Sequence, residues 1–148
     1  MFLIKTPINS LSLLQKLYKF PFCSVGMEYK DWLLQAERDL ETAKNSLLSK
    51  DYYASAFWSQ QSIEKCLKAV IIKELKILVK SHDIIFLGRK AKLPKELIGK
   101  LKLFSGVYTE SRYGITNEEI PSSKFKEKDS SEILNIAKEV LGWSRKMI

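Results

Sequence analysis

Apolar residues recur at helical spacing along two neighbouring segments of the chain, and this pattern limits the fold more than any other feature. Between residues 28 and 50 they lie three or four positions apart, so they share one face of an α-helix. They are Trp32, Ala36, Leu40, Ala43 and Leu47. Residues 52–78 form a second such segment, which is apolar on more than one side. A helix of this kind is expected at the centre of a bundle, where several neighbours cover it. Its main stripe consists of Ala56, Ile63, Leu67, Val70 and Ile71.

Shorter helical segments accompany these two. Asp51 is the expected N-cap of the second helix. Residues 84–87 predict a short helix or a turn. Residues 93–108 predict a longer helix that begins at a proline, and the last helix is expected to start at Asp129 or Ser130. Glycine (6) and proline (4) are scarce, which favours long helices over a turn-rich sheet. The sequence therefore predicts an all-α fold, an antiparallel bundle of four to five helices.

The first 27 residues stand apart from this pattern. Gln15, Lys16 and Lys19 interrupt their apolar run, so neither a signal peptide nor a membrane span of about 18 apolar residues is predicted. We expect residues 1–27 to be an N-terminal extension, either a short basic amphipathic helix or non-native residues upstream of Met27. Residues 28–148 are expected to form the single domain, with a cytoplasmic location and no membrane association.

The chain is basic, with 25 Lys and Arg residues against 17 acidic residues and a formal net charge of +8. Such an excess favours polyanionic partners, because each phosphate contact releases bound counterions. It is equally compatible with a role in solubility alone. Basic residues are dense between Lys73 and Lys102. They would follow a phosphate backbone if they shared one face, and otherwise they form a solvated surface.

Metal and cofactor sites are not predicted. Cys23 and Cys66 are far apart and His82 is the single histidine, which is too few ligands for a tetrahedral zinc site unless a carboxylate joins them. No disulfide is expected, and the apolar surroundings of Cys66 predict a buried thiol. The sequence also contains no glycine-rich phosphate-binding loop.

Three segments together resemble the HEPN family (higher eukaryotes and prokaryotes nucleotide-binding domain). They read DWLLQAERDLETAKNSLLSKDYYASAFWSQQSIEKCLKAVIIKE, then SHDIIFL, then YTESRYG. The resemblance extends from about Glu28 to the C-terminus. It implies a helical bundle with two long antiparallel helices, a homodimer, and a partner protein that is a minimal nucleotidyltransferase in a pair of the toxin–antitoxin kind.

Some HEPN proteins are metal-independent RNases that carry an arginine followed four to six residues later by a histidine. This sequence departs from that motif, because none of its four arginines has a histidine downstream at such a spacing. The departure favours a non-catalytic or weakly catalytic module that binds a nucleotide or nucleic acid. Two alternatives remain open, namely an RNase with a divergent site built from Arg112 and His82, and a purely structural dimer that contacts another protein.

Arg112, Tyr113 and His82 are the first candidates for a binding site. A guanidinium at a helix end can hold a phosphate in bidentate fashion, and the neighbouring tyrosine ring can stack on a base. The alternative is that Arg112 pairs with a carboxylate such as Glu64 while Tyr113 packs against the core. His82 is the natural residue to move a proton, although a histidine before a short apolar helix also packs or caps.

Polar residues on the predicted central helix are the second set of candidates. Gln61 and Lys65 lie four residues apart on one face, and Gln60 and Glu64 do the same. They could line a groove for a nucleotide, with Gln61 and Lys65 as binding residues. They could also form a satisfied buried network or a dimer seam.

Overall fold

A computed structural model of the chain describes residues 25–104, 107 and 121–148. Across these ranges the structure contains α-helices and one 3₁₀ helix and no strand, which confirms the all-α prediction. The elements are α2 (Val25–Leu48), α3 (Tyr52–Leu75), α4 (Ile84–Lys90), α5 (Lys95–Leu101), η1 (Lys102–Phe104), α7 (Pro121–Lys124) and α8 (Glu127–Met147).

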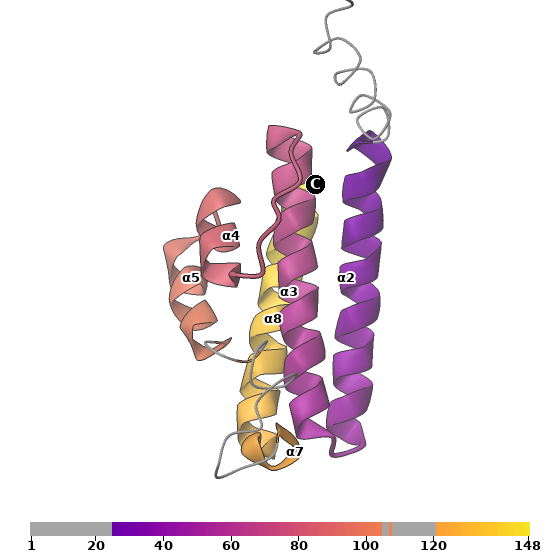
Figure 1. Ribbon diagram of the computed structural model, residues 1–148, viewed down its shortest axis with the longest axis vertical. Coiled ribbons are helices and arrows are strands. Elements are labelled where there is room, and N and C mark those ends of the chain that lie inside the picture. The colour runs from indigo at the N-terminus through magenta and orange to yellow at the C-terminus, as the bar shows by residue number, and fades with distance from the viewer. Residues whose placement is uncertain (1–24, 105–106, 108–120) are drawn as a thin grey trace, which may run out of the picture.

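Three long helices form the body of the molecule, with α3 at the centre (Figure 1). A three-residue turn makes α2 and α3 antiparallel, whereas α8 runs in the same direction as α3. A hydrogen bond joins α3 and α8 at each end of the pair. Ser130 Oγ donates to the Tyr52 carbonyl at 2.6 Å, and Lys73 Nζ donates to the Met147 carbonyl at 3.1 Å. The central position of the most apolar segment is therefore as predicted.

Small side chains bring α2 and α3 close together. Ala36 and Ala43 of α2 and Ala56 of α3 are fully buried. Ser62 Oγ donates a hydrogen bond of 2.8 Å to the carbonyl of Ala36 across this contact. Since these residues have one or two heavy atoms beyond Cα, the backbones can approach closely and still leave no void.

The helix α4 packs against α3, and α5 packs against α4 and α8, so that α4 and α5 form a second layer on one side of the long helices (Figure 1). The carboxylate of Asp83 starts α4, because it accepts hydrogen bonds from the backbone N–H groups of Ile85 and Phe86 at 2.9 and 3.1 Å. In the middle of α4, Gly88 faces Leu101 so closely that an added Cβ would stand 3.2 Å from its Cδ1 atom. The glycine thus permits the tight α4–α5 contact.

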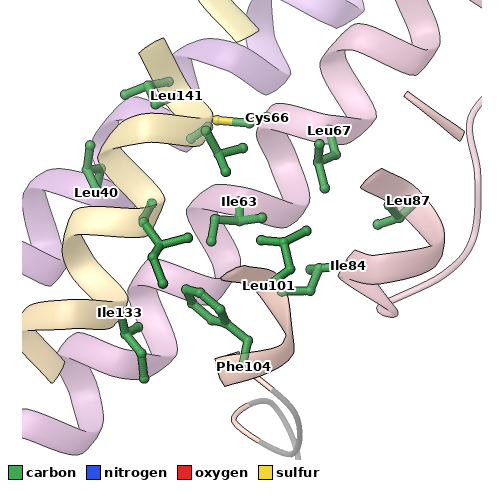
Figure 2. Packing of buried hydrophobic residues seen from close by; sticks show 14 of the residues in the cluster. Leu40, Ile63, Cys66, Leu67, Ile84, Leu87, Leu101, Phe104, Ile133 and Leu141 are labelled. Carbon is green, nitrogen blue, oxygen red and sulfur yellow. The ribbon is translucent and has the colours of Figure 1, made fainter. Parts of the chain in front are cut away.

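The hydrophobic core lies among the three long helices and beneath the α4–α5 layer (Figure 2). The whole predicted stripe of the central helix is buried, from Ala56 to Ile71. Around Ile63, Figure 2 shows Ile84 of α4, Leu101 of α5 and Phe104 of η1, with Ile133 of α8 further along. The α4–α5 layer is therefore part of the single core.

The ends of several helices differ from the sequence prediction, and α2 begins at Val25 and not at residue 28. α3 ends at Leu75 and not at residue 78, because Lys76 takes a left-handed conformation (φ 58°) whose N–H bonds to the Ile72 carbonyl. α5 ends at Leu101 and passes into η1. α8 begins at Glu127, where the Lys126 N–H donates to Asp129 Oδ2 at 3.2 Å. Asp51 does precede α3, but its side chain makes no capping hydrogen bond.

None of the helices in the described residues combines the length and the apolarity that crossing a bilayer requires.

Cys66 is fully buried, as predicted, and burial raises the pKa of its thiol from the ordinary 9.0 to about 12. At pH 8 this shift lowers the thiolate fraction by about a thousandfold, and the thiolate is the reactive form. In a Cys23→Ser variant we therefore expect a disulfide-exchange reagent to label Cys66 only as fast as the protein unfolds. Labelling at the same rate with and without urea would contradict this burial.

Candidate functional site

Among the described residues, Glu64 and His82 form the pair best suited to ligand binding or proton transfer. Glu64 lies in the middle of α3, and His82 precedes α4. The Nδ1 atom of His82 is 3.1 Å from both carboxylate oxygens of Glu64. The carboxylate side chain is 6% exposed, whereas the imidazole is 61% exposed. Because an ionised carboxylate only accepts hydrogen bonds, Nδ1 is the donor, and the buried acid fixes the orientation of a ring that reaches solvent.

Lys68 completes the environment of this carboxylate. Its Nζ atom donates to Glu64 Oε1 at 2.7 Å, one helical turn along α3, and its side chain is 7% exposed. The same ammonium lies 5.3 Å from the centroid of the Trp32 ring on α2. A buried charge is tolerated when it is paired and hydrogen-bonded, and both charges of this pair meet that condition.

Asp39 of α2 anchors a second buried pair beside the first. It is 2% exposed and accepts a hydrogen bond of 2.8 Å from Gln35 Nε2. Its other carboxylate oxygen accepts from Nζ of Lys65. The Lys65 side chain is 20% exposed. The ammonium therefore pairs with Asp39 at the edge of the α2–α3 interface, where it still reaches solvent.

Gln60 and Gln61 link the central helix to the histidine segment. Gln61 Nε2 donates to Gln60 Oε1 at 2.8 Å, and Gln60 Nε2 donates to the His82 carbonyl at 3.5 Å. Gln60 is buried. Gln61 and Lys65, which share a face of α3, contact different partners, Gln60 and Asp39; their role in binding stays a prediction. The glutamines therefore belong to the Glu64–His82 group, which joins α3 to the segment before α4. Asp39, Gln35 and Lys65 form a separate group between α2 and α3.

The other sequence candidates, Arg112 and Tyr113, lie outside the described residues. Their approach to His82 or to Glu64 stays a prediction.

Several hollows occur on the described surface. A small open groove of about 310 Å³ lies over α2 and α3, lined by Asp31, Trp32, Gln35 and Lys65. A larger one of about 810 Å³ runs along α8, where Lys100 Nζ bonds Glu139 Oε2 at 2.8 Å, and it contains no predicted site residue. Within the described ranges no three His, Cys, Asp or Glu side chains gather as a metal site would require.

Sequence reasoning missed Asp39, which pairs with Lys65, and Trp32, which contacts Lys68. A signal for Asp39 was present, because it follows Ala36 by three positions and precedes Ala43 by four, which places a carboxylate on the apolar face of its helix. An acid on such a face needs a buried partner.

Comparison with known proteins agrees with this architecture. A family model described as HEPN domain matches residues 29–147. The structure is similar to that of TT1696 from Thermus thermophilus, with a TM-score of 0.75 and 24% sequence identity over 81% of this chain and 98% of that one. It is also similar to ST0689, described as an archaeal HEPN homologue, with a TM-score of 0.68 and 31% identity over 80% of this chain and 95% of that one. No curated protein matches the chain significantly. The chain belongs to the HEPN domain family.

Proposed function

We propose that this chain is a nucleotide- or RNA-binding module that works with a nucleotidyltransferase partner in a pair of the toxin–antitoxin kind. In this proposal residues 28–148 form the working domain, which acts as a cytoplasmic homodimer, and residues 1–27 are an extension. The observation that carries the proposal is the exposed imidazole of His82, which the buried Glu64 holds in a fixed orientation.

The charges around His82 suit a phosphate group. The Lys68 ammonium offsets the charge of the Glu64 carboxylate, so this pair leaves no net negative charge behind the imidazole to repel a phosphate. A fixed charged donor binds a phosphate oxygen more strongly than a mobile one, because less side-chain entropy is lost. Arg112 and Tyr113 are the proposed second half of the site, with the guanidinium on the phosphate and the ring on the base.

A second candidate function follows from the same pair. A carboxylate that orients a histidine is the arrangement by which histidine serves as a general base. His82 would take the proton of a ribose 2′-hydroxyl, and the 2′-oxygen would attack the adjacent phosphorus. The bond from phosphorus to the next nucleotide's 5′-oxygen would break, and that oxygen would take a proton from water. Arg112 would stabilise the charge on the pentavalent phosphate.

Titration of the purified protein with a fluorescent ATP analogue tests the binding proposal. We expect His82→Ala to weaken binding by about tenfold or more, since a hydrogen bond to a charged group contributes about 1.5–3 kcal/mol. Lys138→Ala, which removes an exposed charge on α8, is the matched control and is expected to bind normally. Equal affinity of wild type and His82→Ala would contradict a phosphate site at His82.

RNA incubated with the protein in the presence of EDTA separates the two candidates. Intact RNA supports a binding module, whereas cleavage that both His82→Ala and Arg112→Ala abolish would establish the nuclease. The partner is tested by co-expression with the product of the neighbouring gene. A nucleotidyltransferase that co-purifies supports the pairing, and a neighbour that encodes no such protein argues against it.

A further inference from the structure

Most of the excess positive charge is concentrated in one short stretch. Residues 80–102 contain seven Lys and Arg residues and two acidic residues, a net charge of +5 within a chain whose net charge is +8. This stretch comprises the end of the α3–α4 connection, α4, α5 and the start of η1. The α4–α5 layer is therefore the most strongly basic part of the described structure.

One face of α4 combines charge with an exposed aromatic ring. Phe86, Arg89 and Lys90 stand at positions i, i+3 and i+4, so their side chains lie next to one another on the helix surface. All three are exposed, with 46% of Phe86 accessible. Lys92 (φ 60°) and Lys95 extend the charge through the α4–α5 turn, and both are exposed.

Among the residues that the structure describes, no carboxylate pairs with the cations of this face. Within the described part of the chain, Arg89, Lys90, Lys92 and Lys95 take part in no ion pair or side-chain hydrogen bond. On the three long helices, by contrast, several cations are neutralised by a nearby acid. These pairs are Lys44–Glu41, Lys65–Asp39, Lys68–Glu64 and Arg145–Glu37.

We propose that the exposed face of α4, together with the α4–α5 turn, binds single-stranded RNA. Arg89 and Lys90 contact phosphates while an unpaired base stacks on Phe86, which is the combination that single-strand-binding surfaces use. The inference rests on the proposed function in taking the polyanion to be RNA, but it concerns a surface separate from the Glu64–His82 pair.

The exposed ring distinguishes this surface from a merely solvated basic helix. Arg89 and Lys90 in the last turn of α4 also offset the helix dipole, and that role alone would explain both cations. It does not explain a phenylalanine on the same face, where its exposure costs hydrophobic free energy. A duplex offers phosphates but keeps its bases stacked inside, so a ring in this position favours a single strand over a duplex.

The test compares two charge-matched double variants by fluorescence anisotropy with a labelled oligoadenylate RNA strand. Arg89→Gln/Lys90→Gln removes two charges from the face, and Lys138→Gln/Lys146→Gln removes two exposed charges from α8. We expect the first to lower the slope of log Kd against log salt concentration by about 1.4, since each phosphate contact on a single strand contributes about 0.7. The second is expected to leave the slope unchanged. Equal effects of the two variants would overturn the proposal.

Phe86→Ala tests base stacking independently of charge. It is expected to weaken binding of the single strand by about tenfold, which corresponds to the lower range of one base stacked on an aromatic ring. The slope of log Kd against log salt concentration should not change, because the ring carries no charge. Binding of an RNA duplex of equal length should not change either, because its bases stay stacked inside. Equal weakening of duplex binding would contradict stacking, and tighter binding of the matching DNA strand would contradict the assignment to RNA.

The outcomes are separable from those of the proposed function. Loss of ATP-analogue binding in His82→Ala concerns the Glu64–His82 pair alone. If wild type and His82→Ala bind the ATP analogue equally while the α4 variants behave as expected, the RNA surface is supported and the nucleotide site is not.

Discussion

Replacing Glu64 by alanine is expected to lower the free energy of unfolding by about 3–5 kcal/mol. The cause is the partner that remains, because the ammonium of Lys68 lies 2.7 Å from the carboxylate in the wild type and its side chain is only 7% exposed. Without Glu64 this charge stays in the interior beside the Trp32 ring. A cation–π contact contributes about 0.5–2 kcal/mol, which is too little to offset the burial of an ammonium ion.

Urea unfolding followed by circular dichroism measures this effect, with the m-value checked for constancy. The double variant Glu64→Leu/Lys68→Met is expected to recover most of the loss, since apolar residues of similar volume often replace a buried pair at no cost. Glu41→Ala is the exposed control. Glu41 and Lys44 form an ion pair of 3.5 Å with side chains 56% and 42% exposed, so its loss should cost at most about 1 kcal/mol. Similar costs for Glu64→Ala and Glu41→Ala would show that the Glu64–Lys68 pair is not buried in solution.

The helices and the core were predictable because the buried residues of a helix recur at regular spacing along the chain. Each residue of the stripe from Ala56 to Ile71 faces the core, and no tertiary information is needed to recognise such spacing. The end of α3 was not predictable in the same way. Ile77 and Leu78 continue the apolar pattern, but they are 40% and 52% exposed beyond the left-handed Lys76. An apolar residue is only a statistical sign of burial, so the prediction extended the helix too far.

The candidate site was predictable only in part, because its contacts join residues that are distant in the sequence. Lys65 meets Asp39 across 26 positions, and Glu64 meets His82 across 18. The first contact depends on the register of α2 against α3, and the second on how the connection to α4 folds back over α3. Neither is encoded in local spacing. His82 was selected for its chemistry alone. That Glu64 orients its ring became known only from the structure.

Shortening Ile63 should reveal that the two layers of the protein unfold as one unit. We expect Ile63→Val to lower the free energy of unfolding by about 0.5–1.5 kcal/mol and Ile63→Ala to lower it by about 2–5 kcal/mol. The side chain is fully buried, and in Figure 2 it lies between the residues of α8 and those of α4, α5 and η1. Close-packed surroundings on several sides cannot collapse into the space that the alanine variant leaves, so a cavity cost adds to the lost transfer free energy.

Leu48→Ala is the matched surface control, because Leu48 at the end of α2 is 81% exposed, and its cost should stay within about 0.5 kcal/mol. Tryptophan fluorescence and circular dichroism should report the same midpoint for Ile63→Ala. If instead the two transitions separate, the α4–α5 layer would unfold independently of the three long helices. Coincident transitions would mean that the basic face of α4 and the segment carrying His82 are held by the same core, so that the proposed RNA surface and the proposed phosphate site keep a fixed relation to each other.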